Sequence, residues 1–220
     1  MLFVRGYVGG WKVVRGVPCP LKGHSYFLDA VSGQVDPQIK RQKNGNEERI
    51  YNLIDFKLKL ETESFALIQT KDSHFEDLYL VASNPIVWEQ HPENDRWKKE
   101  VFSNFFQTAI QNELGCFTIL DKNVDKLIGS TRFYSHDKTD ASVRVGYTFL
   151  APEYWGTSAN LQIKKVMLDY IFQYVEKVYF DISEDNFRSR KATEKLGAIQ
   201  YKKKDGGKLI YKLSKSEYRL

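Results

Sequence analysis

Small residues gather where the sequence predicts the start of a helix. The segment PEYWGTSANLQIKKVMLDYIF (152–172) places Trp155 before Gly156, Thr157, Ser158, Ala159 and Asn160. The first turn of a helix has unpaired backbone N–H groups and the positive end of the helix dipole, which small side chains leave open to an anion. The segment has neither the Lys-Ser/Thr of a Walker loop nor the G-x-G-x-x-G spacing. It predicts either a phosphate cradle made of main chain or an ordinary strand-to-helix turn.

Two further groups of polar side chains could bind a ligand or take part in catalysis. Asn186 and Ser189 are three residues apart at the start of the predicted helix in DNFRSRKATEKLGA. They share one face of its first turn, so either they meet a ligand held by the cradle or they only satisfy the loop and the helix end. The proline-bounded loop VWEQHP contains Glu89 and His91, which either accept a proton during catalysis or simply pack the loop.

Composition narrows the class of protein. The chain has 220 residues, 42% of them hydrophobic, and a net charge of +5. Residues 1–50 contain eight basic and four acidic side chains, so the remainder is nearly neutral and is not a dedicated nucleic-acid binder. Two cysteines and four histidines at no ligand spacing predict neither a disulfide framework nor a metal site. Without a membrane-spanning apolar run or a signal peptide pattern, a cytoplasmic protein is expected.

The order of elements predicts an α+β fold with a mixed sheet. Residues 65–70 read as a strand, followed by a helix after Asp72 or Ser73 and a second helix capped by Asp95. Three antiparallel strands follow at 116–120, 127–134 and 142–150. The helix at 160–174 has one apolar face and exposes Lys164 and Lys165. The last elements are a strand at 177–182, a helix at 186–196 and strands at 198–203 and 208–214.

Residues 1–55 differ in character from the domain expected at 56–220. They are rich in glycine and proline and end in the polar run KRQKNGNEER, which is typical of a linker. The extension either has little fixed structure or forms a hairpin across Gly9 and Gly10 from FVRGYVGGWKVVRGV.

Both motifs and the element order resemble the GNAT superfamily, whose members transfer an acyl group from coenzyme A to an amine. Its signature, Gln/Arg-x-x-Gly-x-Gly/Ala, falls on residues 153–158, with Glu153 and Ser158 as departures. Its later Asn-x-x-Ser helix ending in Lys-Leu-Gly falls on Asn186, Ser189 and residues 195–197. The stretches IGSTRFY, VGYTFLAPEYWG and DGGKLIYKLSKSEY resemble the RimJ/RimL-like branch. The resemblance covers residues 58–220 and implies a mostly antiparallel central sheet flanked by helices.

The resemblance also implies a reaction and its participants. A primary amine, on a small molecule or a protein N-terminus, attacks the thioester of acetyl-CoA directly, without a metal. Backbone N–H groups near Phe149 and Leu150 polarise the thioester carbonyl, and residues 155–160 hold the diphosphate. Asn186 binds the pantetheine arm and Ser189 protonates the leaving thiolate.

Two departures keep other functions open. Thr193 stands where many members have tyrosine, and Arg144 where relatives often have glutamate. The alternative is therefore a catalytically silent module that binds acyl-CoA, and a weaker one is a nucleic-acid-associated protein that uses the basic extension. A monomer or homodimer that contacts acetyl-CoA and an amine, with no membrane and no dedicated nucleic-acid site, is expected.

Overall fold

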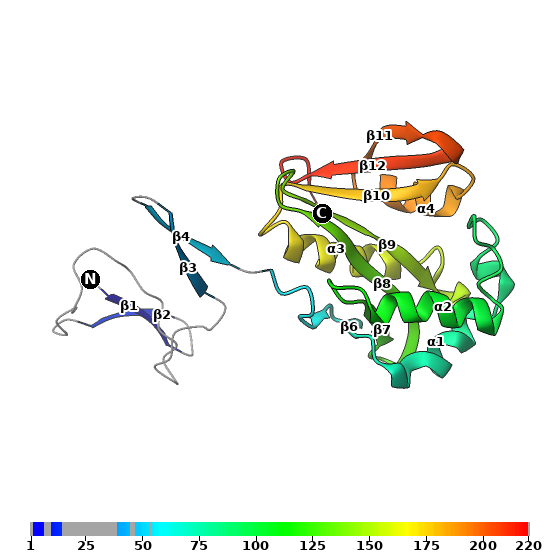
Figure 1. The fold of residues 1–220 in the computed structure, drawn as a ribbon. Helices are drawn as coiled ribbons and strands as arrows, with labels where there is room; N and C mark the ends of the chain where they lie inside the picture. The colour runs from blue at the N-terminus through cyan, green and yellow to red at the C-terminus, as the bar shows by residue number, and fades with distance from the viewer. Residues whose placement is uncertain (1, 7–9, 15–38, 45–46, 53, 220) are drawn as a thin grey trace. The chain divides into compact units, whose positions relative to one another are not determined.

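The computed structural model describes residues 2–6, 10–14, 39–44, 47–52 and 54–219 (Figure 1). Internal contacts divide the chain into residues 1–53 and 54–220. The turn at Gly9 of the expected hairpin lies outside the described residues, and the predicted boundary near residue 55 stays a prediction. The first unit contains two antiparallel pairs: β1 (Leu2–Gly6) with β2 (Gly10–Val14), and β3 (Ile39–Asn44) with β4 (Glu47–Asn52).

Residues 54–219 form one eight-stranded sheet with flanking helices. The strand order is β11-β12-β10-β9-β8-β7-β6-β5, and only β9 and β10 pair in parallel. The predicted mixed, mostly antiparallel sheet is therefore confirmed. The strands are β5 (Leu60–Glu61), β6 (Phe65–Gln69), β7 (Phe117–Asp121), β8 (Lys126–Asp137), β9 (Ser142–Leu150), β10 (Lys177–Ser183), β11 (Ile199–Lys204) and β12 (Lys208–Ser214).

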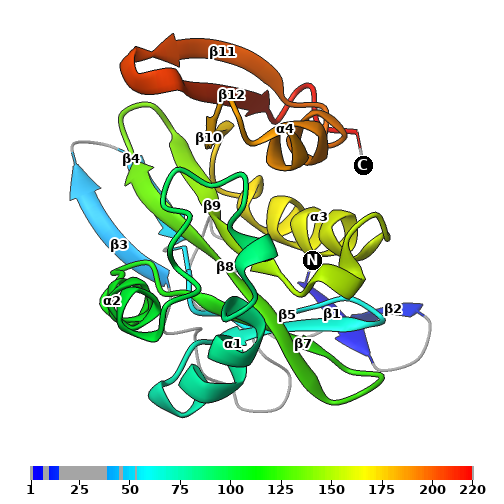
Figure 2. The same cartoon turned by 90° about the vertical axis from the view of Figure 1, so that its right-hand side faces the viewer.

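Helices cover both faces of this sheet. α1 and α2 lie together on one face, and α3 and α4 lie on the other (Figures 1 and 2). The aromatic side chains of α2 pack on Phe149 of β9, and Ile163 and Met167 of α3 pack into the larger core on the opposite side. The helices are α1 (Phe75–Ala82), α2 (Lys99–Ile110), α3 (Ala159–Ile171) and α4 (Phe187–Glu194), with short 3-10 helices η1 (Asp72–His74), η2 (Pro85–Val87), η3 (Pro152–Tyr154) and η4 (Asp205–Gly207).

The buried face of α3 includes Lys164, whose side chain was expected to be exposed to solvent. The buried residues of this helix are Ala159, Ile163, Lys164, Met167, Leu168 and Ile171. Lys164 is only 6% exposed, so the expectation of a solvated charge is wrong for it, whereas the side chain of Lys165 is 44% exposed. The physical reason is spacing: Lys164 lies three, four and seven residues before the buried Met167, Leu168 and Ile171, and therefore on their face.

α2 begins later than predicted. Its N-cap is Lys98 and not Asp95, because residues 95–98 form a turn in which the N–H of Lys98 donates to the carbonyl oxygen of Asp95 (3.0 Å). This turn directs Arg96 into the interior, where its side chain is buried. The expected cap at Asp72 or Ser73 is also absent, since both residues lie within η1 and α1 has no side-chain cap.

Candidate active site

The parallel strands β9 and β10 separate part of the way along their length. They pair at Lys177 with Ser142, Val178 with Val143 and Tyr179 with Arg144. Beyond these pairs β9 continues to Leu150 and β10 to Ser183. A strand edge that leaves its neighbour offers backbone N–H and C=O groups to an extended ligand. The two strands therefore separate toward the end of β9, where the predicted cradle begins.

A β-bulge lies in the separated part of β9. Arg132 of β8 pairs with Gly146 and Ser130 pairs with Phe149, so Tyr147 and Thr148 together lie opposite Thr131. Tyr147 has a φ of +51°. The extra residue redirects the side chains that follow: Thr148 contacts α3, while Phe149 contacts the α1 and α2 cluster. The bulge lies directly before Phe149 and Leu150, whose backbone is predicted to polarise the thioester.

The predicted cradle connects η3 to α3. Trp155 donates from its indole Nε1 to the carbonyl oxygen of Leu150 (3.0 Å), which fixes the turn to the end of β9. Gly156 has a φ of +74°, and a Cβ added there would meet nothing within 4 Å. Its conformation requires glycine, and the space beside it is open.

The start of α3 is available to an anion, with one exception. Ser158, at the N-cap position, forms no side-chain cap, so the first turn keeps unpaired N–H groups. The N–H of Ala159 differs: it donates to Oγ1 of Thr157 (3.2 Å), and that hydroxyl donates to the carbonyl oxygen of Tyr154 (2.7 Å). The turn is therefore held by Thr157, while the amides that follow Ala159 point out of the helix end.

The second motif, Asn186 and Ser189, lies at the start of α4. Oδ1 of Asn186 accepts a hydrogen bond from the N–H of Ser189 (3.0 Å), so Asn186 is the helix cap and Ser189 supplies the capped amide. Within residues 54–219 no hydrogen bond reaches the Ser189 hydroxyl. Both residues remain candidate ligands of the pantetheine arm through the groups that the cap leaves free.

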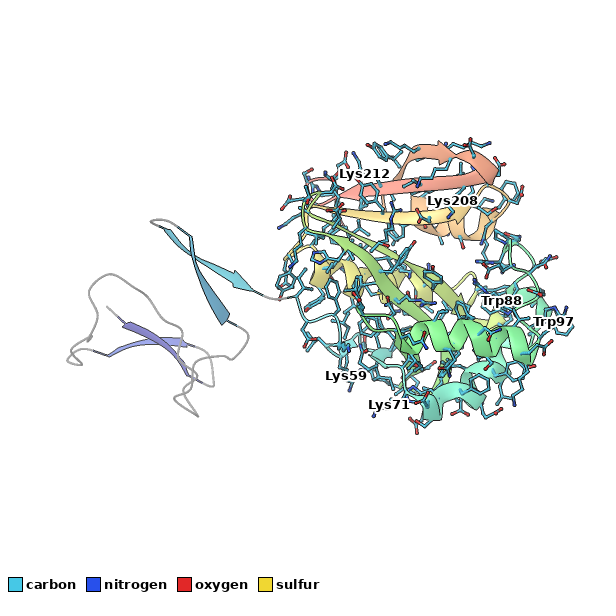
Figure 3. All side chains as sticks on the ribbon, viewed as in Figure 1. Lys59, Lys71, Trp88, Trp97, Lys208 and Lys212 are labelled. Atoms are coloured by element: carbon cyan, nitrogen blue, oxygen red, sulfur yellow. The ribbon has the colours of Figure 1, made fainter. Side chains whose placement is uncertain are left out.

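The VWEQHP loop contacts α4 directly and is linked to the cradle turn through Arg188. The N–H of Arg188 donates to Oε1 of Gln90 (3.0 Å), and its guanidinium lies 3.9 Å from a carboxylate oxygen of Glu89. The same guanidinium stacks on the Trp155 ring, 3.6 Å from its centroid. The loop is anchored by Trp88, labelled in Figure 3, which is 3% exposed and donates to the carbonyl oxygen of Ala82. Glu89, α4 and the cradle turn are thus joined through Arg188.

His91 lies farther inside the loop. Its Nδ1 accepts from the N–H of Glu93 (3.0 Å), and its Nε2 lies 3.3 Å from the buried guanidinium of Arg96. Burial first, and then the charge of Arg96, lower the pKa of His91 to about 4. Arg96 is itself held by Glu93 and stacks over Phe105 at 4.4 Å. His91 is therefore neutral at pH 7 and has both ring nitrogens in contact with loop groups.

Sequence reasoning missed a buried group beside the bulge. Nζ of Lys164 lies 2.6 Å from Oγ1 of Thr148 and 2.8 Å from Oγ1 of Thr131, and these two hydroxyls are 2.8 Å apart. Burial lowers the pKa of Lys164 to about 7. The spacing of Lys164 with Met167 and Ile171 was a signal for its burial, whereas the hydroxyl partners depend on the strand register.

Comparisons with known proteins identify the family of the domain and its fold. The profile of the acetyltransferase (GNAT) domain family matches residues 65–199. No curated protein sequence matches the chain. A similar solved structure is a GNAT-family acetyltransferase from Bacillus anthracis, with 16% sequence identity and a TM-score of 0.62 over 73% of this chain and 100% of that one. A GCN5-related N-acetyltransferase from Brucella melitensis has 16% identity and a TM-score of 0.62 over 82% of this chain and 84% of that one. The ribosomal-protein-S5-alanine acetyltransferase from Vibrio fischeri has 17% identity and a TM-score of 0.53 over 74% of this chain and 100% of that one.

The chain belongs to the GNAT acetyltransferase family, because the profile covers more than half of it. Members of this family use acetyl-CoA, and the mixed, mostly antiparallel eight-stranded sheet with its flanking helices is the GNAT fold. Among the described residues no group of histidine, cysteine and carboxylate side chains is arranged to hold a metal ion. In that same part of the chain no helix is long and apolar enough to cross a membrane.

Proposed function

We propose that this protein transfers the acetyl group of acetyl-CoA to a primary amine, on a small molecule or a protein N-terminus, by direct attack in a ternary complex. The observation that carries the proposal is that two stretches of backbone with unpaired polar groups follow one another along the chain. The unpaired edge of β9 ends at Leu150, and the uncapped start of α3 lies nine residues later at Ala159. A ligand with an extended arm and a terminal diphosphate can pair with the strand edge and place its diphosphate at the helix start.

The residues present suit each part of coenzyme A. The turn at 155–160 has no bulk beside Gly156, and the amides after Ala159 can donate to a diphosphate. The edge of β9 can pair with the amide-rich pantetheine arm, and Asn186 lies at the start of α4 to contact it. A backbone N–H group at Phe149 or Leu150, next to the bulge, would stabilise the negative charge that develops on the thioester oxygen. Most of the rate would come from holding amine and thioester together.

The acceptor side is formed by the loop that contains Glu89 and His91. We propose that Glu89 and His91 both border the site of the amine. A base with a pKa of about 4 takes a proton poorly from an ammonium group at neutral pH, so His91 is better suited to hold the loop than to activate the amine. RimJ/RimL-like use of a protein N-terminus is supported by the sequence stretches and by the likeness of fold to the alanine acetyltransferase. A cytoplasmic protein remains our expectation.

A matched pair of glycine variants tests the cradle. Gly156 and Gly206 both have a φ of +74° and no atom within 4 Å of an added Cβ, but Gly206 lies in the β11–β12 turn. Gly156→Val and Gly206→Val should each destabilise the fold by about 1–2 kcal/mol, because a side chain is strained in this conformation. Only Gly156→Val should abolish acetyl-CoA binding, measured by isothermal titration calorimetry.

Activity needs its own measurement. The protein is mixed with acetyl-CoA and a panel of amines, and free thiol is followed. Thiol release that depends on one class of amine would support transfer. Binding without release across the panel would favour the silent acyl-CoA-binding module, and no binding by the unaltered protein at millimolar acetyl-CoA would refute both. Equal binding by the two valine variants would show that the diphosphate lies elsewhere.

A further inference from the structure

The buried triangle of Lys164, Thr131 and Thr148 lies beside the place where the thioester is proposed to react. Thr148 belongs to the bulge in the separated part of β9 and is half-buried, whereas Thr131 is fully buried and Lys164 is 6% exposed. The triangle therefore connects an amine in the interior with a half-buried hydroxyl on the separated part of β9. The mechanism proposed so far gives this arrangement no role.

We propose that Lys164, acting through the hydroxyl of Thr148, supplies the proton that neutralises the coenzyme A thiolate as it leaves. This inference rests on the proposed acetyl transfer and adds to it the source of a proton. Thr148 would contact the sulfur, and Lys164 would act through Thr148 as a positioning residue.

The hydrogen bonds at Lys164 allow it to donate to both hydroxyls when it is protonated. An ammonium group at Lys164 has only donors, so it donates to Oγ1 of Thr148 (2.6 Å) and Oγ1 of Thr131 (2.8 Å). Thr148 then accepts from Nζ, and its own hydrogen is directed away from the amine. The hydrogen of Thr148 meets the carbonyl oxygen of Gly146, on the same separated part of β9, at the long distance of 3.3 Å. In the proposed step the Thr148 O–H would exchange this bond for one to the sulfur.

The acidity of the buried amine agrees with this direction. Burial lowers the pKa of Lys164 to about 7, and an alkyl thiol such as that of cysteine has a pKa of about 8.5. Proton transfer from Lys164 to a thiolate is therefore downhill. No charged side chain among residues 54–219 contributes to this shift: the groups at Nζ are the two hydroxyls from β8 and β9.

The step balances as follows. When the carbon–sulfur bond of the thioester breaks, the sulfur keeps the bonding electron pair and takes the hydrogen of the Thr148 hydroxyl. The Thr148 oxygen takes a proton from Lys164, which becomes a neutral amine. Water returns a proton to Lys164 through Thr148 after the product leaves, and the proton of the acceptor amine is released to solvent.

Ser189 is the competing source of this proton. Its hydroxyl makes no hydrogen bond to any residue of 54–219, so it has no protein group there that could replace a donated proton. Thr148 has such a group at 2.6 Å. The two hydroxyls can be separated by substitution, since they lie on different elements.

The test compares substitutions of Lys164 and Thr148 with a substitution of Lys165, the next residue of α3. Lys164→Met keeps the length of the side chain and removes the amine, and Thr148→Val removes only the hydroxyl. Thr148→Ser retains the hydroxyl, and Lys165→Met removes an exposed amine next in sequence. The kcat for thiol release is measured against pH with an amine that the unaltered protein accepts, and acetyl-CoA affinity is measured by titration calorimetry.

We expect kcat to fall by about 10²-fold or more in Lys164→Met and Thr148→Val. Acetyl-CoA affinity should change less than twofold, and Thr148→Ser and Lys165→Met should retain the rate. The unaltered protein should lose rate as pH rises through about 7, where Lys164 loses its proton, and Lys164→Met should lack this limb. If Lys164→Met does not fold, the two Thr148 variants decide the question.

A second readout does not depend on activity. Lysine labelled with ¹³C at the ε carbon should show one NMR resonance that titrates near pH 7 and is missing from Lys164→Met. Titration of that resonance near 10.5, or an unchanged rate and pH profile in Lys164→Met, would overturn this inference while leaving acetyl transfer intact. Absence of acetyl-CoA binding by the unaltered protein would instead refute the proposed function and this inference with it.

Discussion

Arg144 of β9 and Asp181 of β10 form an ion pair across the point where their strands stop pairing. The last hydrogen-bonded residue pair is Arg144 with Tyr179, and Asp181 lies two residues farther along β10. The hydroxyl of Tyr134, on β8, also donates to Asp181 (3.3 Å). Both charged side chains are about one-quarter exposed, so the pair joins the two strands beside the open edge.

Asp181→Asn should destabilise the domain by about 1–2 kcal/mol, because it leaves a partly buried guanidinium without a carboxylate. The measurement is thermal or urea unfolding. Glu184→Gln is the matched control, since Glu184 pairs with Lys203 on the exposed strand β11 and should cost no more than about 0.5 kcal/mol. Equal losses in the two variants would mean that the Arg144 pair adds nothing at the strand junction.

Stability should depend on pH through Lys164. Its folded pKa of about 7 lies below the ordinary value of 10.5, so between these values the unfolded chain binds a proton that the folded protein does not. The free energy of unfolding should therefore rise with pH in this window, by up to about 1.4 kcal/mol per pH unit relative to Lys164→Met. Urea unfolding of both proteins at pH 7 and pH 9.5 measures the difference. A difference that stays constant with pH would show that Lys164 is charged at both values.

His91 should make the loop sensitive to acid. Its pKa falls from 6.5 to about 4, so the unfolded chain takes up the proton first as the pH is lowered. The contribution of His91 to stability is present above pH 6.5 and is lost toward pH 4. Unfolding measured at pH 7 and pH 4.5 should show a larger acid-induced loss for the unaltered protein than for His91→Gln. The reverse order would contradict the burial of this imidazole.

Truncation tests the extension. Tyr170 donates to the carbonyl oxygen of Asp55 (2.8 Å) and accepts from its N–H (3.1 Å), and Phe56 contacts Phe133 with ring centroids 5.7 Å apart. A chain of residues 54–220 keeps these contacts, so its melting temperature should lie within about 4 °C of the full chain, with unchanged acetyl-CoA affinity. A chain of residues 57–220 should melt at a clearly lower temperature. A large loss in the longer variant would show that residues 1–53 dock onto the domain.

Periodicity and turn residues predicted most of the sheet. β9 and β12 have the bounds read from their sequences, 142–150 and 208–214, because each is an apolar-rich strand between turn signals: a charged turn and Pro152 around β9, and a glycine turn and a charged turn around β12. The expected cap at Asp95 failed because tertiary packing draws Arg96 inward between Trp88 and Phe105, which delays the helix. Local signals for a cap carry no information about such a contact.

The chemistry of the site was less accessible to sequence reasoning. The short motifs located the turn at Gly156 and the start of α4, because small residues and an Asn cap act locally. The bulge at Tyr147 depends on how β9 pairs with β8, and the Lys164 triangle depends on that bulge. The low pKa of His91 depends first on its burial and then on the charge of Arg96, five residues away through a turn of unpredicted shape. Such features follow from register and packing, which a single sequence leaves open.

The junction of β9 and β10 also bears on how the chain is made. Strands β5 to β9 pair with one another in antiparallel order, and β10, β11 and β12 form a second antiparallel group. The two groups share three residue pairs, all near Ser142. During synthesis the first group and α3 emerge before β10 and can pair without it. The nascent chain can therefore assemble its first group of strands before the ribosome completes the second, and the separated pair of β9 and β10 forms only when the last fifth of the chain, residues 177–220, arrives.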